Sequence, residues 1–453
     1  MDAPTHHADP EQAPEHVAEP SPEQSPSAMR RLIPEEMLER PAACPFDPAP
    51  GLARRRGQGP VQPLELHNGA VAWLVTGFDE ARSVLADARF SADRVRYRDA
   101  TQLQPHEVAE MAAAAERGEP VCPAPVDSRA DGMFVFMDPP EHTRLRRLLT
   151  GQFTVRRMKA LESRVTEIAV EHIEAMKAAG TAADLVPAYA LPLPSLVICE
   201  LLGVDYADRD RFQVNTSIAL NANASDEDRA RAGGELYGFI AQLVAAKRAA
   251  PGEDIISGLI QDAEPPLSDA QLVDVALVLL GAGHETTANM LALGAFALLQ
   301  NPDQVAALRD DPAVVDNAVE ELLRYLSIVQ LGVSRVATEQ VALGGVTVPA
   351  GATVIVATPE VNRDTRHWTD PDRLDVHRDR VPHLAFGHGV HQCLGQQLAR
   401  IEMRVGFTEL LRRLPDLRLA VPATEVPLRN DMLIFGVHSL PVAWSGAPGP
   451  DGS

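Results

Sequence analysis

One glycine-rich stretch with a single cysteine constrains this chain more than any other part of it. Residues 386–395 read Phe-Gly-His-Gly-Val-His-Gln-Cys-Leu-Gly, and a helix-forming segment follows at once. Gly387, Gly389 and Gly395 permit backbone angles and close approaches that side chains forbid. A helix that begins near Cys393 would direct its amide groups and its positive dipole end at the sulfur, which favours the metal-binding thiolate form.

The surroundings of this cysteine narrow the choice of metal. No second cysteine lies near Cys393 in the sequence, whereas a zinc site needs three or four protein ligands. A single axial thiolate suits iron that a porphyrin already holds. The alternative is a buried structural cysteine beside a glycine-rich turn, which is the commoner case for an isolated cysteine.

Composition limits the classes of protein to which the chain can belong. It has 453 residues, 45% of them hydrophobic, which is ample for a large core. The net charge of -22 argues against a protein that binds duplex nucleic acid and favours a soluble monomer whose copies repel one another. The 4 cysteines are scattered, which indicates free thiols in a reducing compartment, so we expect a cytoplasmic protein.

The two ends of the chain differ in composition from its middle. Residues 1–40 are rich in proline, glutamate, alanine and histidine and contain no apolar segment, which argues against a secretory signal or a membrane anchor. We therefore expect a disordered extension over 1–40, one folded domain over 41–446 and a flexible tail over 447–453. The histidines of the extension could touch metal, but a solvated tail is the simpler interpretation.

A long helix is predicted over residues 268–300. Ser268 and Gln271 have the spacing of a capping box, and Asn301-Pro302 ends the helical pattern. The first half of the segment is apolar on nearly every side, as in a buried helix. Gly281 and the polar residues after it come too early for a membrane span. The pattern therefore predicts a helix through the core of the domain.

Inside this helix, residues 282–287 read Ala-Gly-His-Glu-Thr-Thr. The small residues at the start of this stretch leave room beside the helix. A threonine hydroxyl can donate to the carbonyl four residues back, which weakens the helix there and admits water. Glu285 beside Thr286 has the chemistry of a proton relay. The alternative is a polar kink in a core helix, and for His284 packing is the better interpretation.

Together these stretches resemble the cytochrome P450 family. Residues 386–395 with Leu398-Ala399-Arg400 fill every fixed position of the family's haem-binding loop, and residues 282–287 fill its oxygen-activation motif. The resemblance covers about residues 41–444. It implies an α+β fold that is mainly α with small β-sheets and a long central helix over the haem. It also implies haem b as the cofactor, with the Cys393 thiolate as axial ligand.

The resemblance assigns roles to further residues. Glu285 and Thr286 would be the catalytic pair, with Thr286 binding dioxygen and a water and Glu285 passing protons inward. Three residues would support the loop that presents the cysteine, namely Glu321, Arg324 and Arg373. Those expected to contact haem are His142, Arg146, Ala282, Gly283, Arg335, Phe386, Gly387, His391, Cys393, Gly395 and Ala399. Those expected to line the substrate pocket are Leu280, Val329, Leu331, Val333, Met432 and Leu433.

Some of these residues have an ordinary alternative role. His142 and Arg146 lie four apart on a predicted helix and share one face, where the family binds a haem propionate. An exposed basic face is the alternative, above all for Arg144 and Arg147, which could instead meet an acidic electron-transfer partner. The glutamate–arginine pair of the supporting set could likewise be an exposed ion pair that contributes little.

The rest of the chain is expected to combine helices with short strands. Asn68-Gly69 predicts a hairpin turn within 64–75. Residues 91–137 lack periodicity, so they are either a functional lid over the substrate pocket or a disordered insertion. Helices are expected over 79–86, 155–262 with breaks, 312–326 and 399–414, strands over 328–341 and 341–356, and a hairpin tip at 431–436.

The resemblance implies a haem-thiolate monooxygenase that inserts one oxygen atom of O₂ into a C–H bond of a hydrophobic natural product. Electrons would come from a ferredoxin and its NAD(P)H-dependent reductase. Residues 150–157, 282–289 and 435–438 look like the actinobacterial group that tailors natural products, which favours hydroxylation of a macrolide or other polyketide in antibiotic biosynthesis. The alternatives are a steroid or terpenoid hydroxylase, and epoxidation or C–C coupling by the same chemistry. A peroxide-driven enzyme usually lacks the Glu285–Thr286 pair, and a haem-binding sensor would not need it.

Overall fold

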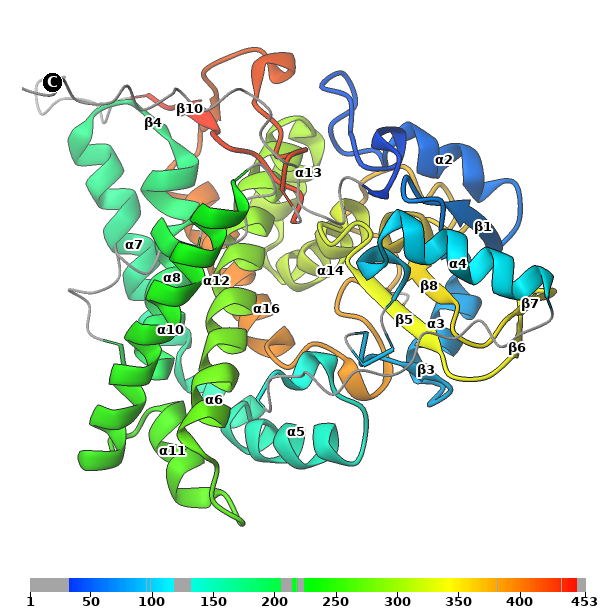
Figure 1. The fold of residues 1–453 in the computed structure, drawn as a ribbon. Helices are drawn as coiled ribbons and strands as arrows, with labels where there is room; N and C mark the ends of the chain where they lie inside the picture. The colour runs from blue at the N-terminus through cyan, green and yellow to red at the C-terminus, as the bar shows by residue number, and fades with distance from the viewer. Residues whose placement is uncertain are drawn as a thin grey trace, which may run out of the picture.

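The helix α12 (Asp269–Leu299) crosses the middle of the molecule (Figure 1). It starts with the predicted capping box, because the Ser268 hydroxyl accepts from the Gln271 main chain and the Gln271 side chain accepts from the Ser268 main chain, each at 3.1 Å. Most of its residues are buried, as its apolar composition predicts. The computed structural model describes residues 32–445 except 95, 98, 118–131, 205–213, 217, 219–223, 381 and 433.

Helices make up most of the fold, which confirms the predicted class. The expected helical region 155–262 breaks after Gly180 and Gly203, and Gly203 ends its helix with a φ of 69°, a conformation that suits glycine. The helices around α12 are α2 (Pro50–Arg56), α3 (Phe78–Ala86), α4 (Pro105–Glu116), α5 (Glu141–Gln152), α6 (Val155–Ala160), α7 (Glu162–Ala179), α8 (Pro192–Leu202), α10 (Asp226–Ala249), α11 (Ile255–Asp262), α13 (Pro302–Asp310), α14 (Val315–Leu326), α15 (Thr358–Val361) and α16 (Gln396–Arg413).

A five-stranded sheet lies on the far side of the molecule from α7, α8 and α10 (Figure 1). Its order is β1 (Val61–Glu65), β2 (Val71–Val75), β8 (Thr353–Val356), β5 (Val333–Ala337) and β3 (Phe90–Ser91). The predicted Asn68-Gly69 turn joins β1 and β2, and Gly69 has a φ of 83°. β2 and β8 are parallel, whereas the other neighbouring strands run antiparallel.

Two smaller sheets complete the strands that the structure describes. A hairpin of β6 (Val341–Leu343) and β7 (Val346–Val348) lies within the predicted region 341–356. A three-stranded sheet of β4 (Ala182–Asp184), β10 (Pro441–Ala443) and β9 (Arg418–Leu419) attaches the end of the domain to the helical side. Within the described residues, no helix combines the length and apolar character that a membrane crossing requires.

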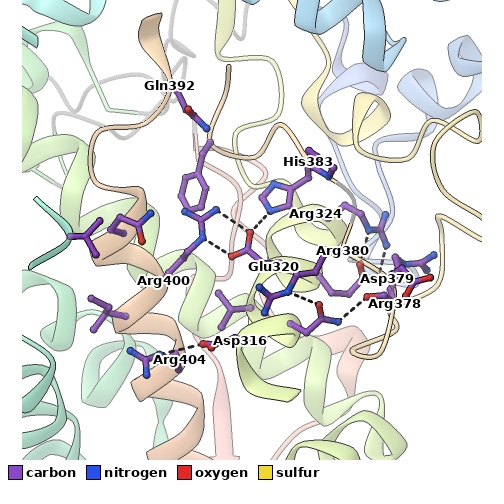
Figure 2. Close-up of a pocket in the computed structure, with 18 of the residues that line it drawn as sticks. Asp316, Glu320, Arg324, Arg378, Asp379, Arg380, His383, Gln392, Arg400 and Arg404 are labelled. Carbon is purple, nitrogen blue, oxygen red and sulfur yellow. Dashed lines mark hydrogen bonds and ion pairs between the residues drawn. The ribbon is translucent and has the colours of Figure 1, made fainter. Parts of the chain in front are cut away.

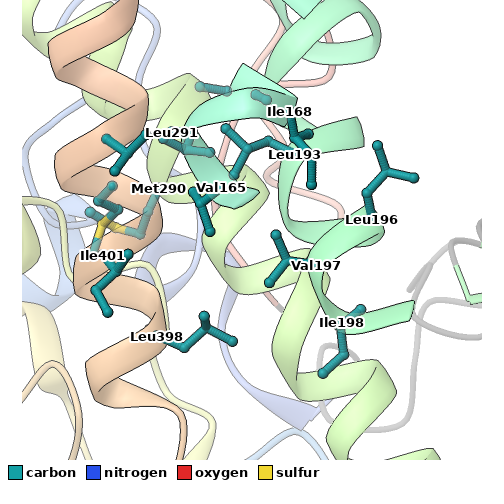
Figure 3. Packing of buried hydrophobic residues seen from close by; sticks show 14 of the residues in the cluster. Val165, Ile168, Leu193, Leu196, Val197, Ile198, Met290, Leu291, Leu398 and Ile401 are labelled. Carbon is teal, nitrogen blue, oxygen red and sulfur yellow. The ribbon is translucent and has the colours of Figure 1, made fainter. Parts of the chain in front are cut away.

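The main core lies where α12 meets α7, α8 and α16 (Figure 3). Val165 and Ile168 of α7, Val197 of α8 and Leu291 of α12 are among the side chains that fill it. The approach of α16 to α12 depends on Gly406, because a Cβ there would lie 2.6 Å from a methyl carbon of Leu291. Close packing of this kind makes large-to-small changes costly, by about 2–5 kcal/mol for a buried leucine replaced by alanine.

Two boundaries differ from those predicted. Residues 32–40 belong to the fold, because Ile33, Met37 and Arg40 are buried and Arg40 donates to the carbonyl of Leu326 at 3.0 Å. Their apolar residues are too few to stand out against the proline-rich composition before them. Part of the expected irregular stretch 91–137 is the helix α4, which alanines of high helix propensity stabilise without an apolar period.

Candidate active site

The cysteine loop between β8 and α16 is folded by two glycines and one main-chain bond. Gly387 and Gly389 have φ values of 69° and 71°, and a Cβ on Gly389 would lie 2.4 Å from the Leu85 carbonyl oxygen. The Cys393 amide donates to the Phe386 carbonyl at 2.8 Å, which closes the loop. α16 begins at Gln396, between the two starts expected for it, near Cys393 and at residue 399, so the sulfur lies just before the first turn.

Several groups influence the charge of the cysteine sulfur. Burial raises the pKa of the Cys393 thiol, while the amides of Gly395 and Gln396 and the cations of Arg146 and Arg400 act in the opposite direction. Burial outweighs them in the protein alone. A bound metal ion would reverse this balance, because a coordinated thiol is deprotonated outright.

A cavity of about 320 Å³ separates this loop from α12. The loop side contributes Cys393, Gly387, Gly395 and Ala399, and the α12 side contributes Ala282, Gly283 and Thr286. A Cβ built on Gly387 or Gly395 would meet no described atom within 4 Å, so the loop leaves open space for a flat ligand. The cavity therefore brings together the two motifs that the sequence places more than a hundred residues apart.

One edge of the cavity collects basic groups from three parts of the chain. His142 and His391 lie with ring centroids 4.1 Å apart, and Arg146 and Arg335 line the cavity beside them. Burial and the neighbouring Arg335 lower the pKa of His391 to about 3, and burial lowers the pKa of Arg335 to about 10. Within the part of the chain that the structure describes, both ring nitrogens of His142 lack a hydrogen-bond partner.

This edge fits the acidic groups of haem. Buried cations and unpartnered ring nitrogens are costly unless an anion meets them. The two propionates of haem would supply that charge beside an open, glycine-lined space and a cysteine sulfur. The donor set in this structure therefore agrees with the haem site that the sequence predicted, although Arg146 also donates to the Gln392 carbonyl.

The central helix has the predicted local geometry at the threonine. Thr286 donates from its hydroxyl to the Ala282 carbonyl at 2.8 Å, the bond expected to weaken the helix. Glu285 is buried, 4% exposed, and forms an ion pair with Arg429. His284 is buried as well, which agrees with the packing role preferred for it.

The supporting trio differs from prediction in one member. Arg324 donates to Glu321 at 2.7 and 2.8 Å, and the pair is buried, not exposed. The third side chain is Arg378, which donates from Nε to Glu321 at 3.1 Å. Arg373 contributes its carbonyl instead, at 3.4 Å from Arg324. The prediction that the Arg373 side chain completes the trio is therefore wrong. The turn at 370–373 directs the backbone of Arg373, and not its side chain, toward Arg324.

The structure places the residues predicted for the substrate pocket in different positions relative to the cavity. Val329 and Val333 line the cavity. Leu280, Leu331 and Met432 are buried but do not belong to the cavity lining that the structure describes, and Leu433 lies outside the described residues. Leu280 is on another face of α12, and the alternation assumed for Leu331 fails because β5 begins at Val333.

Sequence reasoning missed several residues of the cavity wall. Val278 and Leu279 precede Ala282 by about one helical turn and Thr286 by about two, so they lie on the same face of α12. Helical periodicity therefore predicts them from the motif at 282–287. Others have no local signal, since they come from separate segments: Phe134, Val135, Ile198 and Ile328. Glu402 of α16 also lines the cavity, and burial raises its pKa to about 8 while a hydrogen bond from Thr287 acts against this.

A second pocket of about 860 Å³ lies on the other side of the cysteine loop, between α14 and α16 (Figure 2). Glu320 lies between Arg400, which donates to it at 2.5 Å, and His383, 3.1 Å away. Burial raises the pKa of Glu320, but the hydrogen bonds of His383 and Arg400 outweigh it and lower the pKa to about 2. Glu320 of α14 thus contacts a residue on each side of the cysteine loop, His383 before it and Arg400 after it.

Comparison with known proteins agrees with this geometry. The family model described as Cytochrome P450 matches residues 226–444. Cytochrome P450-SU2 of Streptomyces griseolus is 46% identical over 418 residues, 91% of this chain and 99% of that protein. Among solved structures, Rif16 is 50% identical with a TM-score of 0.76, and covers 91% of this chain and 100% of its own. The complex of CYP105P1 with filipin I is 42% identical with a TM-score of 0.82, over 92% and 100%.

A mainly helical fold with a lone cysteine loop facing a threonine-bearing helix defines a haem-thiolate protein. The chain belongs to the cytochrome P450 family. It is therefore a monooxygenase with haem b and a cysteine thiolate as the axial ligand.

Proposed function

We propose that this protein hydroxylates a hydrophobic natural product, of the macrolide or another polyketide class, with electrons from a ferredoxin and its NAD(P)H-dependent reductase. The observation that carries the proposal is the single cavity that holds Cys393 on one side and Thr286 on the other, with an apolar wall between them. In the reaction, one atom of O₂ enters the C–H bond, and the other leaves as water after uptake of two electrons and two protons.

The residues at the cavity have separate tasks. When bound, haem supplies oxygen activation and insertion. Cys393 would hold the iron through its sulfur, and His142, Arg146, Arg335 and His391 would bind the two acidic groups at the edge. The cavity lining from α12 would remain available for O₂ and substrate, because it contributes Ala282, Gly283 and Thr286 and no candidate ligand of the iron.

Thr286 and Glu285 deliver the protons. The Thr286 hydroxyl faces the cavity and gives its hydrogen to the Ala282 carbonyl, so its oxygen can accept a hydrogen bond from a water. Glu285 is the nearest residue in sequence able to pass protons to that water. Water is otherwise excluded by the apolar wall, which includes Val278, Leu279 and Ile328.

The apolar wall and the relatives support the substrate class. Rif16 has been solved with a compound named R-L, and CYP105P1 with filipin I. Other relatives bear names such as pentalenic acid synthase and vitamin D3 dihydroxylase, at 42% and 41% identity. Because these names differ so widely, similarity does not single out one substrate, and steroid or terpenoid hydroxylation is the second candidate.

The face below the cysteine loop is the proposed ferredoxin site. Arg147 of α5 and Lys159 of α6 are exposed, and Lys159 borders the 860 Å³ pocket with Arg400 and Arg404. Arg147 and Lys159 suit an acidic protein partner, whereas Arg400 and Arg404 already pair with Glu320 and Glu162. Arg144, the other candidate, is partly committed because it donates to the Pro265 carbonyl at 2.8 Å.

Turnover with labelled oxygen tests the proposal. The holoenzyme, a surrogate ferredoxin, its reductase, NADPH and ¹⁸O₂ are incubated with filipin I, other macrolides, steroids and terpenoids. We expect a macrolide product heavier by a single ¹⁸O atom. Products from steroids or terpenoids alone would overturn the substrate class, and products without ¹⁸O would overturn the reaction.

A further inference from the structure

The acid of the proposed proton relay is turned away from the cavity. The lining that the structure describes includes Thr286 and Thr287 but not Glu285. Three side chains surround the Glu285 carboxylate instead. Arg429 forms an ion pair with Oε1, Asn289 Nδ2 lies 3.4 Å from Oε1, and His284 Nε2 lies 3.7 Å from Oε2.

Arg429 comes from a distant part of the sequence, the C-terminal hairpin of residues 428–437. Its amide donates to the Gly436 carbonyl at 2.9 Å, and Leu428 pairs with Val437. From this hairpin its guanidinium reaches α12, where Nη1 donates to Asn289 Oδ1 at 3.2 Å. The side chains of Arg429 and Glu285 are 12% and 5% exposed, so the ion pair is largely buried.

The same hairpin is fastened to the wall of the cavity. Phe435 donates from its amide to the Ile328 carbonyl at 2.9 Å, and Ile434 pairs with Val329. Both Ile328 and Val329 line the cavity. The hairpin therefore contacts the substrate wall on one side and the acid of the relay on the other.

Close packing makes this connection stiff. A Cβ added to Gly436 would lie 1.9 Å from Asn289 Oδ1, so the hairpin packs directly against α12 with no room for a larger side chain. A displacement of the wall at Ile328 and Val329 would move the hairpin, and with it the guanidinium of Arg429. An ion pair this buried is sensitive to small changes in geometry, since its attraction must offset the desolvation of both charges.

We propose that Arg429 is a positioning residue that retains Glu285 outside the cavity, and that proton delivery requires Glu285 to leave it. Substrate that presses on the Ile328–Val329 wall shifts the hairpin and loosens the pair. Protons then reach Thr286 when the cavity is filled. This inference rests on the proton-relay role proposed for Glu285, and it adds a residue for which the sequence contains no motif.

The test uses five forms of the holoenzyme: the unchanged protein, Arg429→Gln, Arg429→Lys, Glu285→Gln and the double Arg429→Gln/Glu285→Gln variant. Arg40→Gln is the matched control. Arg40 is a buried arginine whose guanidinium lies 4.1 Å from the ring centroid of Phe435, on the same hairpin, and none of its hydrogen bonds in the structure goes to Glu285.

The first readout is hydrogen exchange of the resting holoenzyme, which needs no substrate. We expect amides within 284–289 to exchange about tenfold faster in Arg429→Gln, because the pair that fixes this turn is gone. Arg429→Lys and Arg40→Gln should leave this segment as it is. Equal exchange in Arg429→Gln and the unchanged protein would overturn the proposal.

The second readout is the solvent isotope effect on NADPH consumption, with peroxide yield, using 7-ethoxycoumarin as the probe. If Arg429 restrains Glu285, Arg429→Gln lowers the isotope effect without raising peroxide, and the effect disappears in the Glu285→Gln background. If Arg429 merely supports the fold, Arg429→Gln raises peroxide as Glu285→Gln does, and the inference is wrong. A Glu285→Gln variant with normal coupling would instead refute the relay itself.

If Arg429→Gln fails to bind haem, the double variant shows whether Arg429 acts through Glu285. The double variant removes both charges, so it should recover haem if Arg429 serves only Glu285. Failure of the double variant to recover haem would mean that Arg429 is a general structural residue, which contradicts the proposal.

Discussion

The guanidinium of Arg400 lies 4.6 Å above the ring of Phe386. Phe386 begins the cysteine loop, and Arg400 belongs to the first turns of the helix that follows it. Through Arg400, the loop is tied to Glu320 of α14, so one arginine joins the loop, α16 and α14. The position of the cysteine sulfur therefore depends on a charge cluster on the face opposite to the substrate.

Removal of the Glu320 carboxylate should weaken this cluster in a pH-dependent way. The pKa of Glu320 falls from its ordinary 4.5 to about 2, so its contribution to stability is complete above pH 4.5 and is lost as the pH falls toward 2. We expect Glu320→Gln to lower the free energy of unfolding at pH 7 by about 1–3 kcal/mol and to remove part of the acid sensitivity. Urea unfolding at pH 7 and pH 3 measures both. An equal effect at the two pH values would contradict this account.

Stability should depend on pH in the opposite direction at Glu402. Burial raises the pKa of Glu402 to about 8, so the folded state keeps the proton that the unfolded state releases above pH 4.5. The free energy of unfolding therefore falls as the pH rises from 4.5 to about 8. Glu402→Gln should therefore raise the free energy of unfolding at pH 8 by about 2 kcal/mol relative to the unchanged protein, with little difference at pH 5. Urea unfolding at the two pH values measures this. A gain of the same size at both pH values would show that ionisation is not the cause.

Thr286→Ala should separate cofactor binding from proton delivery. The haem-thiolate spectrum should persist, whereas reducing equivalents should go to peroxide, with the ratio of product to NADPH falling about tenfold or more. Thr166→Ala is the matched control, because Thr166 makes the same bond to the carbonyl four residues back, at 2.8 Å, on α7. Unchanged coupling in Thr286→Ala would remove this threonine from the mechanism.

Cys393→His should abolish the thiolate-type absorption band of the carbon monoxide complex. Cys199→Ser is the control, because Cys199 is buried among the apolar residues of α8, away from the cavity wall. Survival of the band in Cys393→His would mean that another residue binds the iron.

Replacement of the unpartnered histidine should loosen the cofactor. His142→Ala removes a buried ring whose nitrogens face no described partner, so haem should dissociate faster by about tenfold while the apo-protein loses little stability. Haem transfer to apomyoglobin measures the rate. A stable haem and a weakened apo-protein would assign His142 to packing.

The sequence predicted features that depend on local chemistry. The capping box at Ser268, the hairpin turn at Gly69 and the Thr286 bond each follow from residues within a few positions of one another. The two motifs of the candidate active site are also local patterns, and residues of both line one cavity.

Features that depend on tertiary packing were not predictable. The choice of Arg378 over Arg373 is set by the path of the loop after 370, and the position of Leu280 by the rotation of α12. Arg429 reaches Glu285 across 144 positions of sequence with no motif at either end. Such contacts become visible when the chain is folded.

The substrate class is tested most directly by spectral titration of the ferric holoenzyme. A substrate that displaces water from the iron moves the Soret band toward the high-spin form, so macrolide aglycones, glycosylated macrolides, steroids and terpenoids can be compared on one scale. We expect a saturable shift with one macrolide or polyketide class at micromolar concentration. A clear shift with steroids or terpenoids, and none with any macrolide, would contradict it.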